Sequence, residues 1–349
     1  TQIRLRASSL VTTNCGTLPG MKATLDPREV LQQLAHGGPV SGAELAAQLG
    51  VTRAAVWKQI EALRAAGLPI EARTKVGYCL PWPMELLDAE RIQQALPNPA
   101  APVQVHWALD STQDALARLP CDAPDLSVVL AETQTQGRGR RGHGWASPPC
   151  QGLYLSCLKH FAGGPASLAG LSIAAGVCVA QALAEAGVPD LQLKWPNDVL
   201  AHGAKLAGVL IEVQGEYDGP CTARVGVGVN LRLPPEWHAR LGQPVTDLAT
   251  LCGGRPPERN ALAARLIDHL RTGLITFEEK GLAPFVPDFA RRDALAGQAL
   301  TLTGAGDLHQ GVGRGIDARG ALRVEHAGQV HTIQSSHVSV RLQPSSGGG

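Results

Sequence analysis

The sequence predicts an α+β protein in which a small helical unit precedes a larger unit built on one mixed or antiparallel sheet. Three observations lead to this prediction. Three short amphipathic helix patterns and two strand-like runs fill residues 26–80. Between residues 103 and 280, strand-like runs alternate with helix-like runs, which favours helices packed against a sheet. After Gly297 only short strand-like runs remain, separated by glycine and aspartate turns, as in a small β-barrel.

Composition limits the classes of protein to which the chain can belong. Its 349 residues leave room for two or three domains. The net charge of +1 provides no general attraction for nucleic acid or membranes, so such a partner would need a local patch. No apolar run reaches the roughly 18 residues of a membrane helix. The chain is therefore not expected to have a membrane partner. The eight cysteines contain no C-x-x-C pair, which indicates free thiols in a reducing cytoplasm and no structural zinc.

The two ends of the chain are expected to lie outside the folded domains. Residues 1–21 lack the apolar core of a signal peptide and predict a disordered leader, with Met21 as a candidate start of translation. Residues 344–349 consist of one proline followed by serines and glycines, which predicts a flexible tail. Between these ends we expect three domains, at 22–83, 84–296 and 297–343.

The first domain is predicted to be a winged helix-turn-helix. Helices are expected at 27–35, from Ser41 to Gly50, and from Thr52 to Gly67, with Ser41 and Thr52 as N-caps. Two strands, 70–73 and 78–80, would form the wing.

The expected DNA-binding face of this domain is weakly basic. Seven basic against five acidic side chains over residues 22–80 give a net charge of +2. Arg53, Trp57 and Lys58 fall on the outward side of the third helix, and Arg73 and Lys75 lie in the wing. A winged helix that binds protein, or that is purely structural, remains an alternative.

The second and third domains follow from the run of predicted elements. Helices are expected at 112–118, 167–186 and 257–280, after a short one at 89–95. Strands of the central sheet are expected at 103–108, 126–131, 152–158, 191–200, 205–213 and 222–230. Strands of the barrel are expected at 299–303, 311–316, 321–325, 330–333 and 338–342.

A glycine- and arginine-rich stretch, GRGRRGHGW at residues 137–145, lies between two of these strands. Alternating glycines let backbone N–H groups approach an anion, and arginine forks suit carboxylate or phosphate. The stretch therefore predicts a loop that holds a small anionic ligand. A solvated loop, or one that binds nucleic acid, is the alternative, because a glycine-spaced pattern by itself is weak.

A hairpin is predicted from KWPNDV at 194–199 and KLAGVLIE at 205–212. A two-residue turn at His202 and Gly203 would pair position 198 with 207 and position 200 with 205. Lys194, Asp198 and Lys205 would then share one face, with Asp198 and Lys205 about 7–8 Å apart, unless Pro196 breaks the register. One carboxylate and two lysines can hold Mg²⁺ and polyphosphate together, whereas a structural ion pair is the alternative.

These motifs, together with GVGVN at 226–230, resemble those of biotin–protein ligases in content, order and spacing. The resemblance runs from about residue 25 to residue 342. Because a winged helix is present, the chain resembles the bifunctional type that is both a ligase and the repressor of biotin-synthesis genes. The implied fold adds a central mixed-sheet domain of the biotin/lipoate ligase type and a small C-terminal SH3-like β-barrel.

The resemblance implies an activity and its partners. Biotin and ATP, with Mg²⁺, would give biotinyl-5′-AMP, and biotin would pass to a lysine of a biotin carboxyl carrier protein. The adenylate would also act as co-repressor at operator DNA. We expect the bound adenylate to close the loop at 137–145 and thereby to promote a homodimer. Two alternatives stay open: a ligand-sensing repressor without ligase activity, and a lipoate–protein ligase.

The resemblance also assigns roles to side chains. Lys205, Arg140 and Asp198 are the implied catalytic residues, with Asp198 also a ligand of Mg²⁺. The set implied for biotin is Asp110, Ser111, Thr112, Gln113, Gln134, Arg138, Gly139, Arg140 and Lys205. The set implied for ATP and the adenylate is Arg138, Arg140, His143, Trp145, Lys194, Asn197 and Asn230, with Trp145 and Asn230 on either side of the adenine.

The chain departs from the family pattern at three places. Gln113 replaces the usual asparagine, and His143 replaces a common arginine that would contact phosphate. Ser336 and His337 replace the usual Gly-Glu near the end of the last domain, where the carrier would dock.

Overall fold

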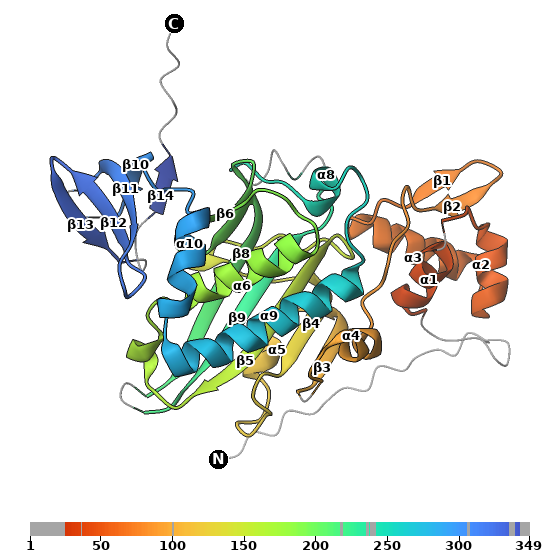
Figure 1. Ribbon diagram of the computed structural model, residues 1–349. Helices are drawn as coiled ribbons and strands as arrows, with labels where there is room; N and C mark the ends of the chain where they lie inside the picture. Colours follow the sequence, from red (N-terminus) through yellow and green to blue (C-terminus); the bar gives the residue numbers. More distant parts are fainter. Residues whose placement is uncertain are drawn as a thin grey trace, which may run out of the picture. The chain divides into compact units, whose positions relative to one another are not determined.

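The computed structural model describes residues 25–35, 37–99, 101–216, 219–234, 237, 242–305, 308–334 and 339–342. The expected leader at 1–21, the tail at 344–349 and the Ser336-His337 departure lie outside these residues. The chain divides into two compact units, with the boundary between Met84 and Glu85 (Figure 1). No helix of the described residues is long and apolar enough to cross a membrane.

The first unit is the predicted winged helix-turn-helix. It contains α1 (Pro27–Ala35), α2 (Gly42–Leu49), α3 (Arg53–Ala65), β1 (Glu71–Arg73) and β2 (Gly77–Cys79). The Ser41 hydroxyl accepts from the Glu44 amide and the Thr52 hydroxyl from the Ala55 amide, so both predicted N-caps are confirmed. The helices bury one apolar face each, with Val30, Leu34, Leu45, Val56 and Ile60 at its centre.

The second unit is organised around a seven-stranded mixed sheet. In chain order its strands are β3 (Val103–Leu109), β4 (Val128–Gln134), β5 (Gly152–Phe161), β6 (Leu191–Lys194), β7 (Asp198–Ala201), β8 (Ala204–Gly215) and β9 (Cys221–Asn230). Their order across the sheet is β3-β4-β5-β9-β8-β7-β6. Among these neighbouring strands only β3 and β4 are parallel. The sequence allowed either a mixed or an antiparallel sheet, and the sheet is mixed.

The single strand expected at 191–200 is wrong. The chain turns back after Lys194, and β6 pairs with β7 in an antiparallel hairpin with Lys194 opposite Asp198. Pro196 lies in the turn, where its lack of an N–H group costs no ladder hydrogen bond. Pro196 thus lies between two short strands, β6 and β7, where one long strand was expected.

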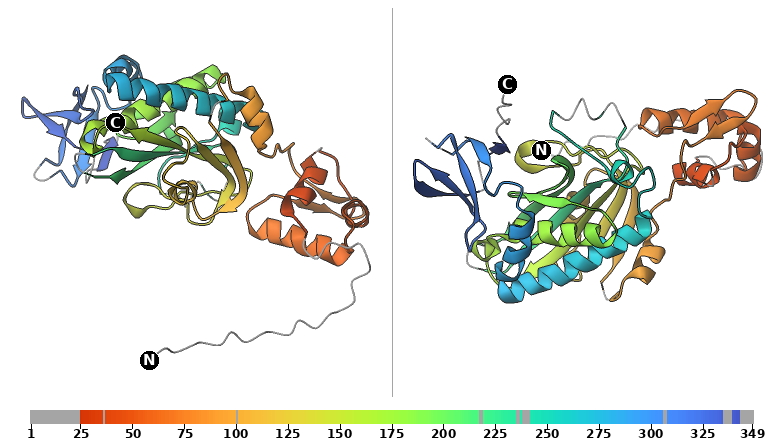
Figure 2. Two further views of the ribbon diagram at one scale, coloured as in Figure 1. Left: turned by 90° about the horizontal axis from the view of Figure 1, so that it is seen from below. Right: turned by 45° about the horizontal axis from the view of Figure 1, so that its top comes forward.

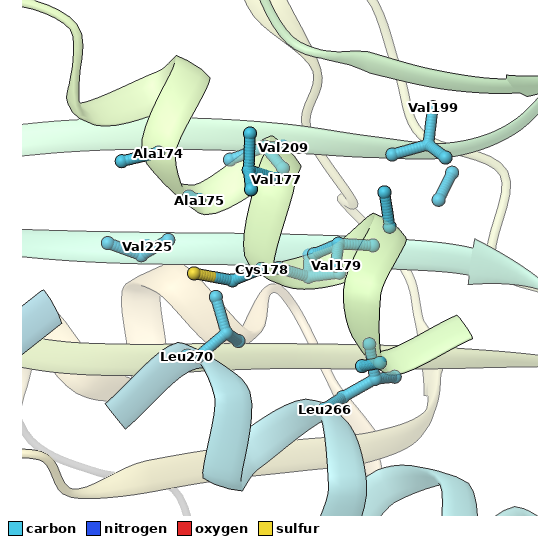
Figure 3. Packing of buried hydrophobic residues seen from close by; sticks show 14 of the residues in the cluster. Ala174, Ala175, Val177, Cys178, Val179, Val199, Val209, Val225, Leu266 and Leu270 are labelled. Carbon is cyan, nitrogen blue, oxygen red and sulfur yellow. The ribbon is translucent and has the colours of Figure 1, made fainter. Parts of the chain in front are cut away.

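Two helices, α6 (Leu171–Glu185) and α9 (Arg259–Lys280), lie side by side over one face of this sheet (Figures 1 and 2). The helix expected from residue 167 begins only at Leu171, because Pro165–Leu168 form a 3-10 turn and Gly170 has a φ of 85°. Figure 3 shows Cys178 and Val179 of α6 packed between the sheet residues Val209 and Val225 and helix α9. This layer is the main hydrophobic core.

Shorter elements complete the central region. They are α4 (Ala89–Ala95), α5 (Thr112–Ala117), α8 (Leu248–Leu251), α10 (Val286–Arg292) and 3-10 turns at Arg140–Gly142, Pro165–Leu168 and Ala283–Phe285. Helix α5 packs against β4, β5 and β9. A buried ion pair, Arg259 Nη2 to Glu132 Oε2 at 2.7 Å, joins α9 to β4 two residues before Gln134.

The C-terminal region is a five-stranded antiparallel sheet, as expected for an SH3-like fold. Its strands are β10 (Ala299–Thr303), β11 (Gln310–Ile316), β12 (Leu322–His326), β13 (Gln329–Ile333) and β14 (Ser339–Leu342), in the order β13-β12-β11-β10-β14. Leu300, Leu302, Leu322 and Val324 fill its interior. The Trp195 indole N–H donates to the Gly320 carbonyl at 2.9 Å, which ties this sheet to the β6–β7 turn.

Candidate functional site

The candidate site has a floor of glycines on the sheet face opposite α6 and α9. Side chains alternate along a strand, so Val209 and Val227 enter the core while Gly208 and Gly228, which are paired across β8 and β9, face the other way. The indole of Trp145 lies directly on this floor. A Cβ atom at Gly228 would come within 2.3 Å of the ring and one at Gly208 within 3.0 Å, so larger residues would displace it.

Trp145 also carries a buried polar atom. Its indole N–H has no hydrogen-bond partner among the described residues. Buried donors are nearly always paired in native proteins, so an unpaired one indicates a place where a ligand or water binds. The glycine floor and this donor together favour a site for a planar or extended ligand.

A lysine–aspartate pair lies beside the floor. The predicted pairing of 200 with 205 is confirmed, but the predicted pairing of 198 with 207 is wrong. A register shift between Val199 and Leu200 places Asp198 opposite Gly208 instead. Such bulges re-aim side chains. The result brings Lys205 Nζ within 2.7 Å of Asp198 Oδ1, with both side chains less than one fifth exposed.

Further cations gather around this one carboxylate. Lys194 lies opposite Asp198 in the hairpin, and burial lowers its pKa against the opposing effect of Asp198. Burial also lowers the pKa of Arg140, which Arg141 lowers further and Asp198 raises. Among the described residues, Lys194 and Lys205 thus share one aspartate with Arg140 close by, and this local positive charge suits an anionic ligand.

Asn197 connects the cations to the sheet. Arg140 Nη1 donates to Asn197 Oδ1 at 3.4 Å, and Asn197 Nδ2 donates to the Val209 carbonyl at 2.8 Å. The amide therefore holds the β6–β7 turn against β8 and positions Arg140 at the same time.

The loop at 137–145 is folded back on itself. Arg138 forms an isolated bridge with Gly144, the Gly139 amide donates to the His143 carbonyl, and the Trp145 amide donates to the Gly137 carbonyl. At its tip Arg141 has a φ of 57° and Gly142 one of 73°. A Cβ at Gly137 would lie 2.6 Å from the Trp145 carbonyl oxygen, so the glycine spacing permits this close return. His143 is exposed on the outside.

A second polar group lies at the N-terminus of α5. The Thr112 amide donates to Gln134 Oε1 at 2.9 Å, and the Thr112 and Ser156 hydroxyls are 2.8 Å apart. Ser111 caps α5 by accepting from the Gln113 amide. Ser111, Thr112 and Gln113 are almost fully buried, so the structure brings together polar residues that are expected to bind biotin's ring system.

Gln113 uses only part of its hydrogen-bonding capacity. Its amide donates to the carbonyls of Leu210 and Arg224 at 3.0 and 3.2 Å, whereas its buried Oε1 has no partner among the described residues. A Cβ at Gly226 would lie 2.7 Å from Nε2, so this glycine makes room for the longer side chain.

Two expected site residues are engaged elsewhere. Asn230 donates to the carbonyls of Lys205 and Thr246, which fixes the strand that carries Lys205. Arg138 is held by Asp114 and Glu212, neither of which was expected from the sequence. Strand alternation from Gly208 could have placed Glu212 on the site face. Nothing local in the sequence relates Asp114 to Arg138.

The first unit has its own candidate surface. Arg53, Trp57 and Lys58 of α3 are exposed, with 59% of Trp57 accessible. A hollow of about 650 Å³ between α3 and the wing is lined by these helix residues Arg53 and Trp57 and by Arg73, Lys75 and Val76. Basic side chains suit the phosphates of DNA, and an exposed apolar ring suits the apolar edges of its bases.

Both units match known families. A family model described as "HTH domain" matches residues 28–79, and one described as "Biotin/lipoate A/B protein ligase family" matches residues 108–230.

Curated relatives match over nearly the whole chain. The "Bifunctional ligase/repressor BirA" of Salmonella typhimurium is 35% identical over 321 residues, which are 92% of this chain and 99% of the relative. The protein of the same name from Escherichia coli is 34% identical over the same shares. Among solved structures, the biotin protein ligase of Aquifex aeolicus in complex with biotin and ATP superimposes with a TM-score of 0.59 and 27% identity, over 69% of this chain and 99% of that one.

Proposed function

The chain belongs to the family of bifunctional ligase/repressor proteins named BirA, and we propose that it joins biotin to a carrier protein and represses biotin-synthesis genes. The observation that carries the ligase half is the group of cations beside the glycine floor, where Lys194, Lys205 and Arg140 lie around Asp198. We propose three domains, at residues 22–83, 84–296 and 297–343.

The proposed ligase reaction has two steps. An oxygen of the biotin carboxylate attacks the α-phosphorus of ATP, which forms biotinyl-5′-AMP and releases pyrophosphate. The amine of a carrier lysine, once deprotonated, then attacks the acyl carbon, forms an amide and releases AMP. The first step brings two anions together, so preorganised cations lower its barrier most.

Each side-chain cluster has a part in this reaction. Lys205 neutralises the carboxylate and the α-phosphate, and Arg140 covers the acyl phosphate. Ser111, Thr112, Gln113 and Gln134 bind the ring system of biotin, while the Gly139 backbone lies with Arg140 over the carboxylate. The remaining residues proposed for the nucleotide are His143, Trp145, Lys194, Asn197 and Asn230. Closure of the loop keeps water from the mixed anhydride.

Asp198 is the residue that we propose for Mg²⁺. Mg²⁺ is usually held by one or two carboxylates together with substrate phosphates. Asp198 offers one carboxylate beside the cations, and no three His, Cys, Asp or Glu side chains cluster into a metal site within the described ranges. This donor set fits an ion that arrives with ATP, whose phosphate charge Mg²⁺ neutralises when bound.

The first unit supplies the repressor half of the proposal. Arg53, Trp57 and Lys58 on α3, with Arg73 and Lys75 in the wing, form the face that meets operator DNA. A net charge of +2 over residues 22–80 gives weak binding by one copy, because affinity grows with the number of phosphates neutralised. We therefore propose a homodimer, favoured by bound adenylate, that contacts two half-sites in the cytoplasm.

The test of the ligase half uses biotin, ATP labelled at the α-phosphate and a biotin carboxyl carrier domain. We expect labelled adenylate on the protein and biotin on one carrier lysine. Because the matching family model also covers lipoate ligases, a parallel reaction contains lipoate. Lipoate transfer without biotin transfer would replace the substrate, and the absence of any adenylate would leave a repressor without ligase activity.

A further inference from the structure

We propose that Arg138 is a positioning residue, a latch that fastens the loop at 137–145 to α5 and β8, and that it brings no positive charge to the biotin carboxylate. This inference rests on the proposed function, because the loop is the one that would close over the adenylate. It departs from the role that the family resemblance implies for the Arg138 side chain.

The geometry of the latch is a guanidinium shared between two carboxylates. Arg138 Nη1 donates to Asp114 Oδ2 at 2.5 Å and Nη2 to Asp114 Oδ1 at 2.8 Å. On its other edge, Nε and Nη2 donate to Glu212 Oε1 at 3.2 and 3.0 Å. Asp114 comes from α5 and Glu212 from β8, so the two-pronged contact joins three segments.

The charges of this group are already balanced. Arg224 Nη2 lies 3.6 Å from Glu212 Oε2, so two arginines face two carboxylates. Asp198 has the opposite character, because two lysines, Lys194 and Lys205, face this one carboxylate within the part of the chain that the structure describes. An incoming anion is therefore attracted to the lysine cluster and not to Arg138. The hydrogen bonds that Arg138 donates to the Asp114 carboxylate raise the pKa of Arg138 above its ordinary value, so the latch stays charged.

The latch acts on the whole loop through the backbone. Arg138 is bridged to Gly144, and the neighbouring Trp145 amide is bonded to the Gly137 carbonyl. Holding the Arg138 side chain therefore holds both arms of the loop and the Trp145 ring above the glycine floor. Loss of the latch should loosen the loop and let the adenylate leave before it reaches the carrier.

The test measures how fast preformed adenylate leaves the protein. The variant Asp114→Asn with Glu212→Gln removes both carboxylate charges and keeps the size of both side chains. Arg314→Ala is the matched control, because it breaks a comparable ion pair with Glu325 in the C-terminal sheet. Labelled adenylate is formed with limiting biotin, unlabelled biotin is added in excess, and release is followed by filter retention.

The latch and the charge-delivery role predict opposite results. We expect the double variant to release adenylate about tenfold faster, as for the loss of two partly exposed ion pairs, and to have a raised KM for biotin with kcat nearly unchanged. If Arg138 instead served the substrate, removing its two counter-charges would make the site more positive, and biotin would bind more tightly. Release from the wild type should also speed up with salt, while release from the double variant should not.

A second variant keeps the test decisive if the carboxylate changes disturb folding. Arg138→Lys preserves the charge but cannot span two carboxylates with a planar fork. The latch predicts fast release from this variant, at a midpoint of thermal unfolding matching that of Arg314→Ala. Retention equal to the wild type would overturn the latch alone. No adenylate on the wild type would overturn the proposed function and the latch with it.

Discussion

At the scale of single residues, Lys205 shows how much the site depends on one irregularity of a strand. The register shift between Val199 and Leu200 places Asp198 opposite Gly208, and Lys205 Nζ then reaches Asp198 Oδ1. The lysine lies over the edge of the floor, 5.3 Å from the centre of the Trp145 ring. It thus contributes to the charge of the site and little to the core.

We expect Lys205→Ala to slow adenylate formation by a factor on the order of 10²–10³, because it removes charge that stabilises the transition state. Pyrophosphate release at saturating biotin and ATP measures this. Lys159→Ala is the control, since Lys159 is also buried in ion pairs, with Asp125 and Glu278, away from the glycine floor. That variant should lose stability and keep its rate at low temperature. A Lys205→Ala enzyme at near wild-type rate would remove the role given to this lysine.

Burial makes a separate prediction for the cysteines. It raises the pKa of Cys157 and of Cys178 to about 12, so both remain thiols at pH 8, where only a thiolate would react quickly. Cys121 is exposed. Iodoacetamide at pH 8 should therefore modify Cys121 and leave Cys157 and Cys178 protected until the protein unfolds. Peptide mass spectrometry before and after denaturation measures this, and early modification of Cys178 would contradict the packing of α6.

At the scale of elements, α6 and α9 approach each other closely at Gly273. A Cβ at this position of α9 would lie 2.2 Å from the sulfur of Cys178 on α6. Gly176 of α6 provides a contrast, because a Cβ there would meet Leu193 at 3.6 Å, an ordinary packing distance. The same substitution should therefore have opposite effects at the two helical glycines.

We expect Gly273→Ala to reduce the free energy of unfolding by about 1–3 kcal/mol, as other overpacked cores do. Gly176→Ala should be neutral or stabilising by about 0.5–1 kcal/mol, because alanine favours the helix. Denaturant unfolding of the two variants compares them. Adding Cys178→Ala should rescue Gly273→Ala, and a loss that persists in the double variant would place the strain elsewhere.

The elements also show where reading the sequence succeeds. Ser41 and Thr52 are N-cap residues, and they predict where α2 and α3 begin. The apolar runs of β5, β8 and β9 likewise predict buried strands. The strand at 191–200 could not be predicted correctly, because an apolar pattern does not reveal where a chain turns back. The partners of Arg138 lie 24 and 74 residues away, and their contact depends on the tertiary fold. Motifs thus identify the chemistry of the site, while its internal pairing requires the structure.

At the scale of the whole molecule, the account joins a catalytic product to a DNA-binding surface. The same adenylate that waits for a carrier lysine would favour the dimer, so ligand binding and operator binding would be coupled thermodynamically. Unmodified carrier would draw off the adenylate and weaken repression. Repression would then report that the demand for biotin is met.

Operator binding with and without the adenylate tests this central claim most directly. A duplex selected from random sequence by the protein in the presence of biotin and ATP serves as the probe, and sedimentation at fixed salt gives size and affinity together. We predict that the protein with biotin and ATP sediments as a dimer and binds the duplex about tenfold or more tightly than the protein alone, within the usual range of allosteric coupling. Trp57→Ala should lose this binding and keep adenylate formation. Equal size and equal affinity with and without biotin and ATP would contradict the account and leave a ligase with a constitutive DNA anchor.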